Sequence, residues 1–143
     1  MGLRDKIFIS KDETVQGLYE KLKTERGDSP TKPFRFDRDI FLAAAAIGQR
    51  EKQFKQLDAS DRKDKFTWGT LLNDPHALAA LRAIALAHEK NPEVLLDDDR
   101  VASIAEGYAN AGIHILAKRI LNTGVDELEE AALYMSGLDA KPS

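Results

Sequence analysis

The histidines and the clustered acids are the side chains of this chain best suited to chemistry. His76, His88 and His114 show none of the spacings typical of metal ligands, and the pair at 88–89 does not continue to an H-E-x-x-H pattern. The acids at 97–99 lack the alternating ligands and the turn glycine of a calcium loop, so the start of a helix explains them better. We therefore expect no metal site and no catalytic residue.

The motifs that mark common cofactor sites and nucleophiles are also absent. The chain contains no G-x-x-x-x-G-K phosphate loop, no G-x-S-x-G nucleophile elbow and no G-x-G-x-x-G dinucleotide fingerprint. Because it has no cysteine, thiol catalysis, thiolate metal sites and disulfide bonds are excluded. These absences predict a protein that is not an enzyme and that uses no cofactor.

A predicted helix around residue 110 carries the residues that most need a structural explanation. Gly107, Asn110 and Gly112 disfavour a helix interior, and each glycine costs roughly 1 kcal/mol relative to alanine. Glycines at that cost indicate that another element packs closely against the helix. Glu106 and Tyr108 add polar side chains beside them. Two interpretations remain: a close helix crossing in which Asn110 bonds a neighbouring backbone, which we favour, or a groove that binds a partner or ligand.

The order strand, helix, helix in residues 6–51 matches a ribbon-helix-helix unit, a homodimeric DNA-binding arrangement in which two chains pair their strands. The outward strand side chains of such a unit enter the DNA major groove, and here they would be Arg4, Lys6, Phe8 and Ser10. Arg4 and Lys6 suit phosphate or base contacts, whereas Phe8 is poorly suited to hydrogen-bonded readout of bases. The alternative is a lone strand that covers a helical core or pairs with a partner protein.

A second group of cations follows the predicted second helix. The candidate DNA contacts in it are Arg50, Lys52, Lys55 and Lys63. Acids at 51, 58, 61 and 64 are interleaved with these cations, which favours a merely solvated segment over a polyanion site. Residues 1–65 hold 15 basic and 12 acidic side chains, whereas residues 66–143 hold 6 and 12. This asymmetry favours either a polyanion contact by the front half or head-to-tail protein contacts.

Hydrophobic spacing and capping signals predict the elements that would position these residues. A strand is expected at 6–10, because apolar and polar residues alternate there. Helices are expected at about 11–26, from 37, from 75 to 89, from 97 to 121 and at 126–136. Ser10 with Glu13 predicts a capping box for the first helix, and Asp37 predicts a cap for the second. The stretch from Arg50 to Lys65 has few apolar anchors and is expected to be an exposed loop or a frayed helix.

The expected fold is mostly α: a single compact domain of about five helices over residues 1–143, with one short N-terminal strand and a flexible tail at 137–143. A chain of this length can bury a core without disulfides or metal. No signal-peptide region and no apolar run of membrane-spanning length are evident, so the protein is expected to be soluble. The absence of cysteine fits a cytoplasmic location.

Three blocks of the sequence together resemble one protein family. They are FDRDIFLAAAAIG at 36–48, AIALAH at 83–88 followed by NPEVL at 91–95, and EGYANAG at 106–112. In order and spacing, over roughly residues 6–122, the chain resembles the small proteins of the dnd system-associated protein 4 type. These proteins accompany DNA phosphorothioation systems, the bacterial gene clusters for sulfur modification and restriction.

The resemblance implies a role in modification-linked defence against foreign DNA and implies no established catalytic residue. Our leading hypothesis is an accessory protein of a phosphorothioation-type modification or restriction system that acts by binding protein partners or DNA. The first alternative is a homodimeric ribbon-helix-helix regulator that uses Arg4, Lys6 and Ser10. The second is a helical adaptor without nucleic-acid contact.

Overall fold

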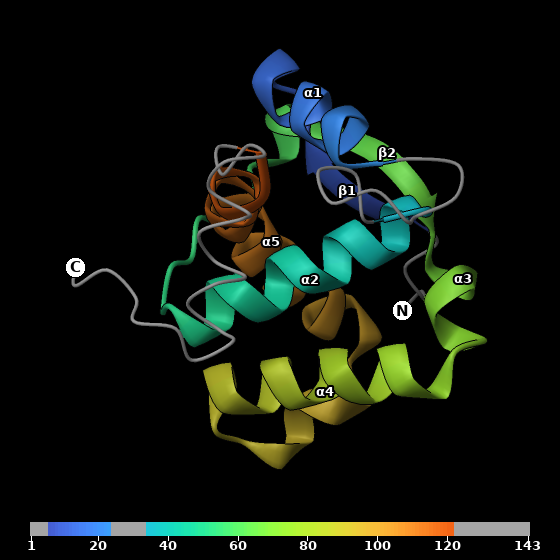
Figure 1. Cartoon of the computed structure of the whole chain (residues 1–143). Helices are drawn as coiled ribbons and strands as arrows, with labels where there is room; N and C mark the ends of the chain where they lie inside the picture. The colour runs from blue at the N-terminus through green and yellow to red at the C-terminus, as the bar shows by residue number, and fades with distance from the viewer. Residues whose placement is uncertain (1–5, 24–33, 122–143) are drawn as a thin grey trace, which may run out of the picture.

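The computed structural model of the chain describes residues 6–23 and 34–121 (Figure 1). In chain order the elements are β1 (Lys6–Ser10), α1 (Glu13–Leu22), α2 (Asp37–Arg50), the 3-10 helix η1 (Ala59–Asp61), β2 (Arg62–Thr67), α3 (Trp68–Leu72), α4 (Pro75–Glu89), the 3-10 helix η2 (Pro92–Leu96) and α5 (Asp98–Leu121). The expected class, mostly helical with a strand at the N-terminal end, is confirmed. The helix expected at 126–136, the tail at 137–143 and Arg4 lie outside the described residues.

The long helix α5 organises the molecule. It contacts α1, α2, α4 and β1, and in Figure 1 it lies behind α2, with α4 along the lower side and the strands and α1 above. Val101, Ile104 and Ile113 of α5 are buried in one core with Ile40 and Phe41 of α2. Residues 101–110 of α5 are buried at every position except Ser103, so this part of the helix is packed on nearly all sides.

Small residues let α2 and α5 approach backbone to backbone. A Cβ added to Gly112 of α5 would overlap the carbonyl oxygen of Ala44 and lie 2.9 Å from the backbone nitrogen of Gly48. A Cβ at Gly48 would in turn overlap the carbonyl oxygen of Tyr108. Real Cβ atoms essentially never lie within 3.0 Å of such atoms, so only glycine fits both positions. Gly112 of α5 is thus explained by a helix crossing.

A second strand, β2, is the main difference from the expected fold. It pairs antiparallel with β1, with Ile7 opposite Phe66 and Ile9 opposite Lys63. The expectation of a loop or frayed helix from 50 to 65 is therefore wrong where β2 lies. The first four residues of β2 are all charged, so no alternation of apolar and polar residues marked it as a strand.

The starts of the first two helices also differ from the expected ones. The N-cap of α1 is Asp12, whose side chain accepts a hydrogen bond from the Thr14 amide at 2.7 Å. The capping box predicted at Ser10 is therefore wrong, and the Ser10 hydroxyl instead accepts a hydrogen bond from the Asp12 amide. Helix α2 begins at Asp37 after Phe36, and no side chain caps it. The prediction that Asp37 caps α2 is also wrong.

Ion pairs with two lysines explain why Asp37 does not act as a cap. One carboxylate oxygen lies 3.1 Å from Lys23 Nζ and the other lies 3.8 Å from Lys65 Nζ. The same carboxylate adds to the effect of burial in raising the pKa of the Tyr19 phenol, and Lys65 Nζ lies 5.1 Å from the centre of the Tyr19 ring. Asp37 therefore links the end of α1 and strand β2 to the start of α2. Its partner Lys65 has a side chain that is only 10% exposed.

The predicted starts of α4 and α5 are confirmed. The Asp74 side chain accepts hydrogen bonds from the amides of His76 at 3.1 Å and Ala77 at 3.2 Å, with Pro75 as the first helical residue. The Asp97 side chain accepts a hydrogen bond from the Arg100 amide at 3.1 Å. Helix capping therefore accounts for the leading acid of the run at 97–99.

Candidate functional site

The α5 residues singled out from the sequence lie inside the molecule; they are Glu106, Tyr108, Asn110 and Gly112. Glu106 is 2% exposed, and its carboxylate accepts a hydrogen bond from the Phe8 amide of β1 at 2.8 Å. Asn110 donates its side-chain amide to the carbonyl of Lys55 at 3.2 Å. These contacts correspond to the helix-crossing interpretation. The four residues hold elements of the same chain together and do not line an open groove.

An aromatic cluster closes over α5 at Gly107. The ring of Phe54 stacks on His88 at 4.9 Å between centroids and meets the ring of Tyr108 edge-on at 4.9 Å. The Tyr108 hydroxyl and His88 Nδ1 share a hydrogen bond of 2.8 Å, and the Lys55 amide donates to the Gly107 carbonyl at 3.0 Å. A Cβ at Gly107 would overlap the Phe54 ring. Sequence reasoning assigned Phe54 to no site, although an aromatic residue in a charged stretch was a signal.

The strand residues predicted to contact DNA do not form one outward row. Lys6 is exposed, with its Nζ 3.7 Å from an Asp64 carboxylate oxygen. Ser10 is 4% exposed and donates its hydroxyl to Asp61 at 2.8 Å, so its predicted outward position is wrong. The pairing of β1 with β2 shifts register between Ile7 and Phe8, where Lys65 of β2 has no partner in β1. The pairing of β1 with β2 also occupies an edge that a ribbon-helix-helix dimer would offer to its second chain.

The cations predicted after the second helix belong to two different elements. Arg50 ends α2, and Lys52 and Lys55 follow it, with all three residues exposed. Lys63 instead lies in β2, opposite Ile9. The structure therefore keeps three of the four predicted contacts in one segment, and places the fourth in the sheet.

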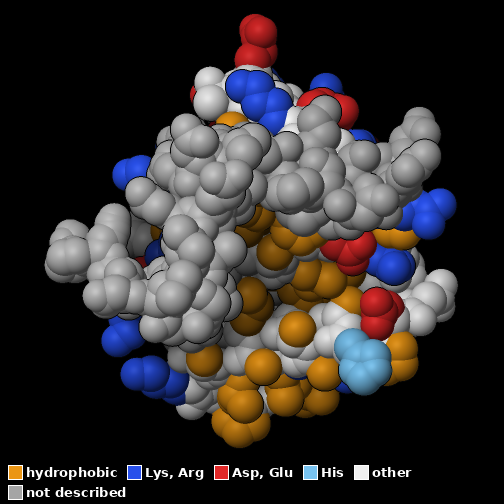
Figure 2. Space-filling view, viewed as in Figure 1, with side chains coloured by type: hydrophobic (Ala, Val, Ile, Leu, Met, Phe, Trp, Pro, Cys, Tyr) orange, Lys and Arg blue, Asp and Glu red, His pale blue; other side chains and the backbone are white. Residues whose placement is uncertain are grey.

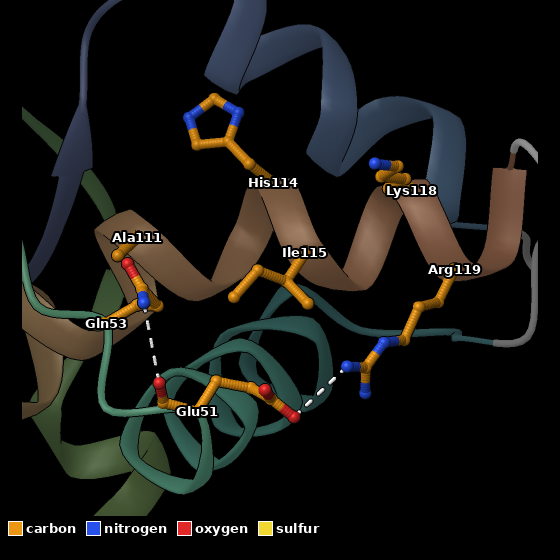
Figure 3. Close-up of a pocket in the computed structure, with 7 residues that line it drawn as sticks. All are labelled: Glu51, Gln53, Ala111, His114, Ile115, Lys118 and Arg119. Atoms are coloured by element: carbon orange, nitrogen blue, oxygen red, sulfur yellow. Dashed lines mark hydrogen bonds and ion pairs between the residues drawn. The ribbon is translucent and has the colours of Figure 1, made fainter.

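An open groove of about 820 Å³ lies where this segment meets the last turns of α5 (Figure 3). Its lining residues are Glu51, Gln53, Ala111, His114, Ile115, Lys118 and Arg119. The α5 members form two rows at helical spacing of four residues, one of Ala111, Ile115 and Arg119 and one of His114 and Lys118, which point to different sides of α5 in Figure 3. Sequence reasoning missed Lys118 and Arg119 as candidates because they lie more than sixty positions after the first basic segment.

The groove combines exposed cations with one bridging acid. Glu51 accepts a hydrogen bond from Arg119 at 3.1 Å, and its other neighbour, Arg50, lies 3.9 Å away through Nε. In Figure 3 the Arg119 side chain reaches from α5 to Glu51 across the groove. Lys118 is exposed on the preceding position of α5, and Lys52 follows Glu51 in the chain. Positive charge therefore exceeds negative charge around the groove, which suits an anionic ligand.

Two other kinds of site find no support in the residues that the structure describes. Among residues 6–23 and 34–121, no group of three or more His, Cys, Asp or Glu side chains is placed to hold a metal ion. Within the same ranges, no helix combines the length and the apolar character needed to cross a membrane.

A second surface of interest is the outer face of α4. Figure 2 shows hydrophobic side chains along this helix at the lower edge of the molecule and in a hollow above it. Leu86 is 37% exposed, and the neighbouring positions Ala83 and Ala87 are exposed as well. Apolar surface of this kind is typical of protein contacts.

Comparison with known proteins identifies the family of the chain. The family model of DNA sulphur modification system-associated protein 4 matches residues 6–142, a range that includes all three blocks of the resemblance. No curated protein and no solved structure matched the chain. The family predicted from the sequence is thereby confirmed, and the chain belongs to the DNA sulphur modification system-associated protein 4 family.

Proposed function

We propose that this protein is a non-catalytic accessory component of a bacterial DNA phosphorothioation-type modification and restriction system, which defends against phage. It acts by binding DNA phosphates through the groove between the 50–55 segment and α5. The family membership supports the link to the system, and the groove supports the contact with DNA. The apolar outer face of α4 is available for the proteins of the same system.

One observation carries this proposal: folding brings Glu51 and Gln53, from the segment that also contains Arg50 and Lys52, into one groove with Lys118 and Arg119. Each group alone is short, and the first is interrupted by an acid. Exposed cations thus occur in the segment on one side of the groove and on α5 at the other, and cations spread in this way can neutralise successive phosphates of a nucleic acid backbone. Contacts of this kind bind without reading base sequence.

A salt titration tests the proposed groove. We expect a fluorescein-labelled DNA duplex to bind the wild-type protein with an affinity that falls steeply as ionic strength rises. The Lys118→Ala variant should bind more weakly, and its slope of log K against log salt should be lower by about 1. The matched control is Arg82→Ala, which removes an exposed charge from α4. Fluorescence anisotropy gives both quantities. Equal losses for the two variants would contradict a specific groove.

The same titration separates the alternatives. If Lys6→Ala abolishes binding and Lys118→Ala does not, the ribbon-helix-helix interpretation is favoured. If the wild-type protein binds no duplex even at low salt, the adaptor without nucleic-acid contact is favoured.

Changing Glu51→Gln should increase affinity for DNA. The substitution removes the acid that lies between Arg50 and Arg119 and keeps the size of the side chain. Less negative charge then opposes a phosphate at the groove, so we expect binding several-fold tighter at low salt, on the order of 0.2–1 kcal/mol per exposed pair. The control is Glu93→Gln, an exposed acid on η2. Unchanged or weaker binding of the Glu51 variant would place the DNA contact elsewhere.

A further inference from the structure

A second pocket, of about 350 Å³, lies at the other end of α2. Its lining residues are Phe36, Asp37, Arg38, Phe66 and Thr70. Phe36 is 48% exposed, although it is a large aromatic residue. Because α2 has 14 residues, this pocket lies roughly 20 Å along the helix from the groove. It is therefore a separate site.

Two guanidinium groups share the exposed Phe36 ring. The Cζ of Arg35 lies 5.2 Å from the ring centre and the Cζ of Arg38 lies 5.5 Å from it. Asp39 lies 3.5 Å from Arg38 Nε, whereas Arg35 has no ion pair among the described residues. Two like charges on one ring repel each other, and an anion between them relieves that repulsion. Asp37 in the lining is already paired with Lys23 and Lys65, so Arg35 and Arg38 are the cations at the rim that suit a ligand with a negative charge.

The remaining lining residues, Phe66 and Thr70, supply a packed ring and one hydroxyl group. Phe66 packs edge-on against Phe41, with centroids 5.6 Å apart and an interplanar angle of 78°. The hydroxyls of Thr67 and Thr70 lie 3.0 Å apart, within hydrogen-bond distance. A flat ligand in this pocket would meet the rings of Phe36 and Phe66 and the hydroxyl group of Thr70.

We infer that this pocket binds one unstacked nucleobase of a single-stranded nucleic acid. Phe36 stacks on the base, and Arg35 and Arg38 contact the phosphates on either side of it. A nucleotide joins a π face to a negative charge, whereas an aromatic side chain of a protein partner brings no charge of its own. The two arginines therefore favour a nucleobase over a protein side chain. Duplex DNA keeps its bases stacked, so this site acts on single-stranded segments only.

The test compares a short labelled oligothymidylate with a duplex of equal length. Phe36→Leu keeps an apolar side chain but removes the ring, and should weaken single-strand binding by about 5- to 150-fold, the range for loss of one stacked base. Duplex binding should stay unchanged. Phe36→Trp should retain single-strand binding, and Leu96→Ala, a change at a residue that is 88% exposed, should alter neither. Thermal melting of each variant shows whether it is folded.

Salt dependence separates the roles of the ring and the cations. The loss caused by Phe36→Leu should be the same at every salt concentration, whereas Arg35→Gln should lower the slope for the single strand by about 0.7. Equal single-strand affinity of wild type and Phe36→Leu would overturn the inference.

A free nucleotide tests the pocket independently of the groove. Thymidine 5′-monophosphate should shift the amide NMR signals of Phe66 and Thr70 in the wild-type protein and in Lys118→Ala alike. Shifts confined to the signals of His114 and Lys118 would reject the base site and leave the groove proposal intact. Shifts of Phe66 and Thr70 by a phenylalanine-containing peptide but not by the nucleotide would also reject it, in favour of a protein ligand.

Discussion

Gly112→Ala is expected to lower the free energy of unfolding by at least about 2 kcal/mol, because overpacking outweighs the gain of roughly 1 kcal/mol in helix propensity. The new methyl group would overlap the carbonyl oxygen of Ala44 and lie 2.9 Å from the backbone nitrogen of Gly48. Both neighbours are backbone atoms, so no side chain can rotate away. The two helices must separate, and contacts along the whole α2–α5 interface weaken. Urea denaturation measures the change.

Gly17→Ala is the matched control for this prediction. Gly17 lies within α1, and a Cβ there meets nothing within 4 Å. The same substitution should therefore stabilise the protein by about 0.4–1 kcal/mol, because alanine lowers the conformational entropy of the unfolded chain. If Gly112→Ala stabilises the protein as Gly17→Ala does, the close crossing described for α2 and α5 is refuted.

The crossing also predicts how two substitutions combine. Gly48→Ala should destabilise by the same mechanism, since its Cβ would overlap the Tyr108 carbonyl oxygen. Once either substitution has separated the helices, the second meets less resistance. The double variant should therefore lose less stability than the two single losses added together.

Glu106→Ala is expected to cost roughly 2–3 kcal/mol of stability, because it leaves the Phe8 amide without its charged hydrogen-bond acceptor. The Glu106 carboxylate is almost fully buried and joins α5 to β1. Glu106→Gln keeps an acceptor oxygen of the same reach, so its loss should be smaller. Denaturant unfolding gives the magnitudes, and amide hydrogen exchange of Phe8 reports the contact directly.

An exposed acid provides the control for Glu106. Glu93→Ala removes the same charge from the surface of η2 and should change stability by less than about 0.5 kcal/mol. Protection of the Phe8 amide should fall in Glu106→Ala and stay as in the wild type in Glu93→Ala. Full protection of that amide in Glu106→Ala would show that the carboxylate does not hold β1.

Two parts of helix α5 contribute to the proposed function: its middle holds other elements in place, and its last turns carry cations. Glu106, Asn110 and Gly112 hold β1, the 53–55 segment and α2 against it. Its last turns then present Lys118 and Arg119 beside that same segment. Phe54 packs on His88 and over Gly107 of α5, and this contact fixes the position of the 53–55 segment relative to α5.

Local signals predicted the helices well because they act within a few residues. Asp74 followed by Pro75 marks the start of α4, and the acids at 97–99 mark the start of α5. The glycines at 107 and 112 predicted a close neighbour because their cost in a helix needs a compensating contact. The family also followed from short blocks whose order and spacing are visible in the chain.

The missed features all depend on residues distant in the chain. Strand β2 is recognisable only through its pairing with β1, and Ser10 is buried where its hydroxyl donates a hydrogen bond to Asp61, fifty-one positions later. Asp37 does not cap α2 and instead forms ion pairs with Lys23 and Lys65, which belong to other parts of the chain. Local spacing contains no information about such pairings.

The amino-acid order by itself determined the helical class, the positions of α4 and α5, the need for a close contact at the glycines and the family. Those properties follow from local conformational preference and from short motifs. Only the tertiary structure decided which cations face one another and which polar side chains are buried. Glu51 and Arg119 form an ion pair, and Lys118 lines the same groove, because α2 and α5 pack against each other with their closest backbone contacts at Gly48 and Gly112.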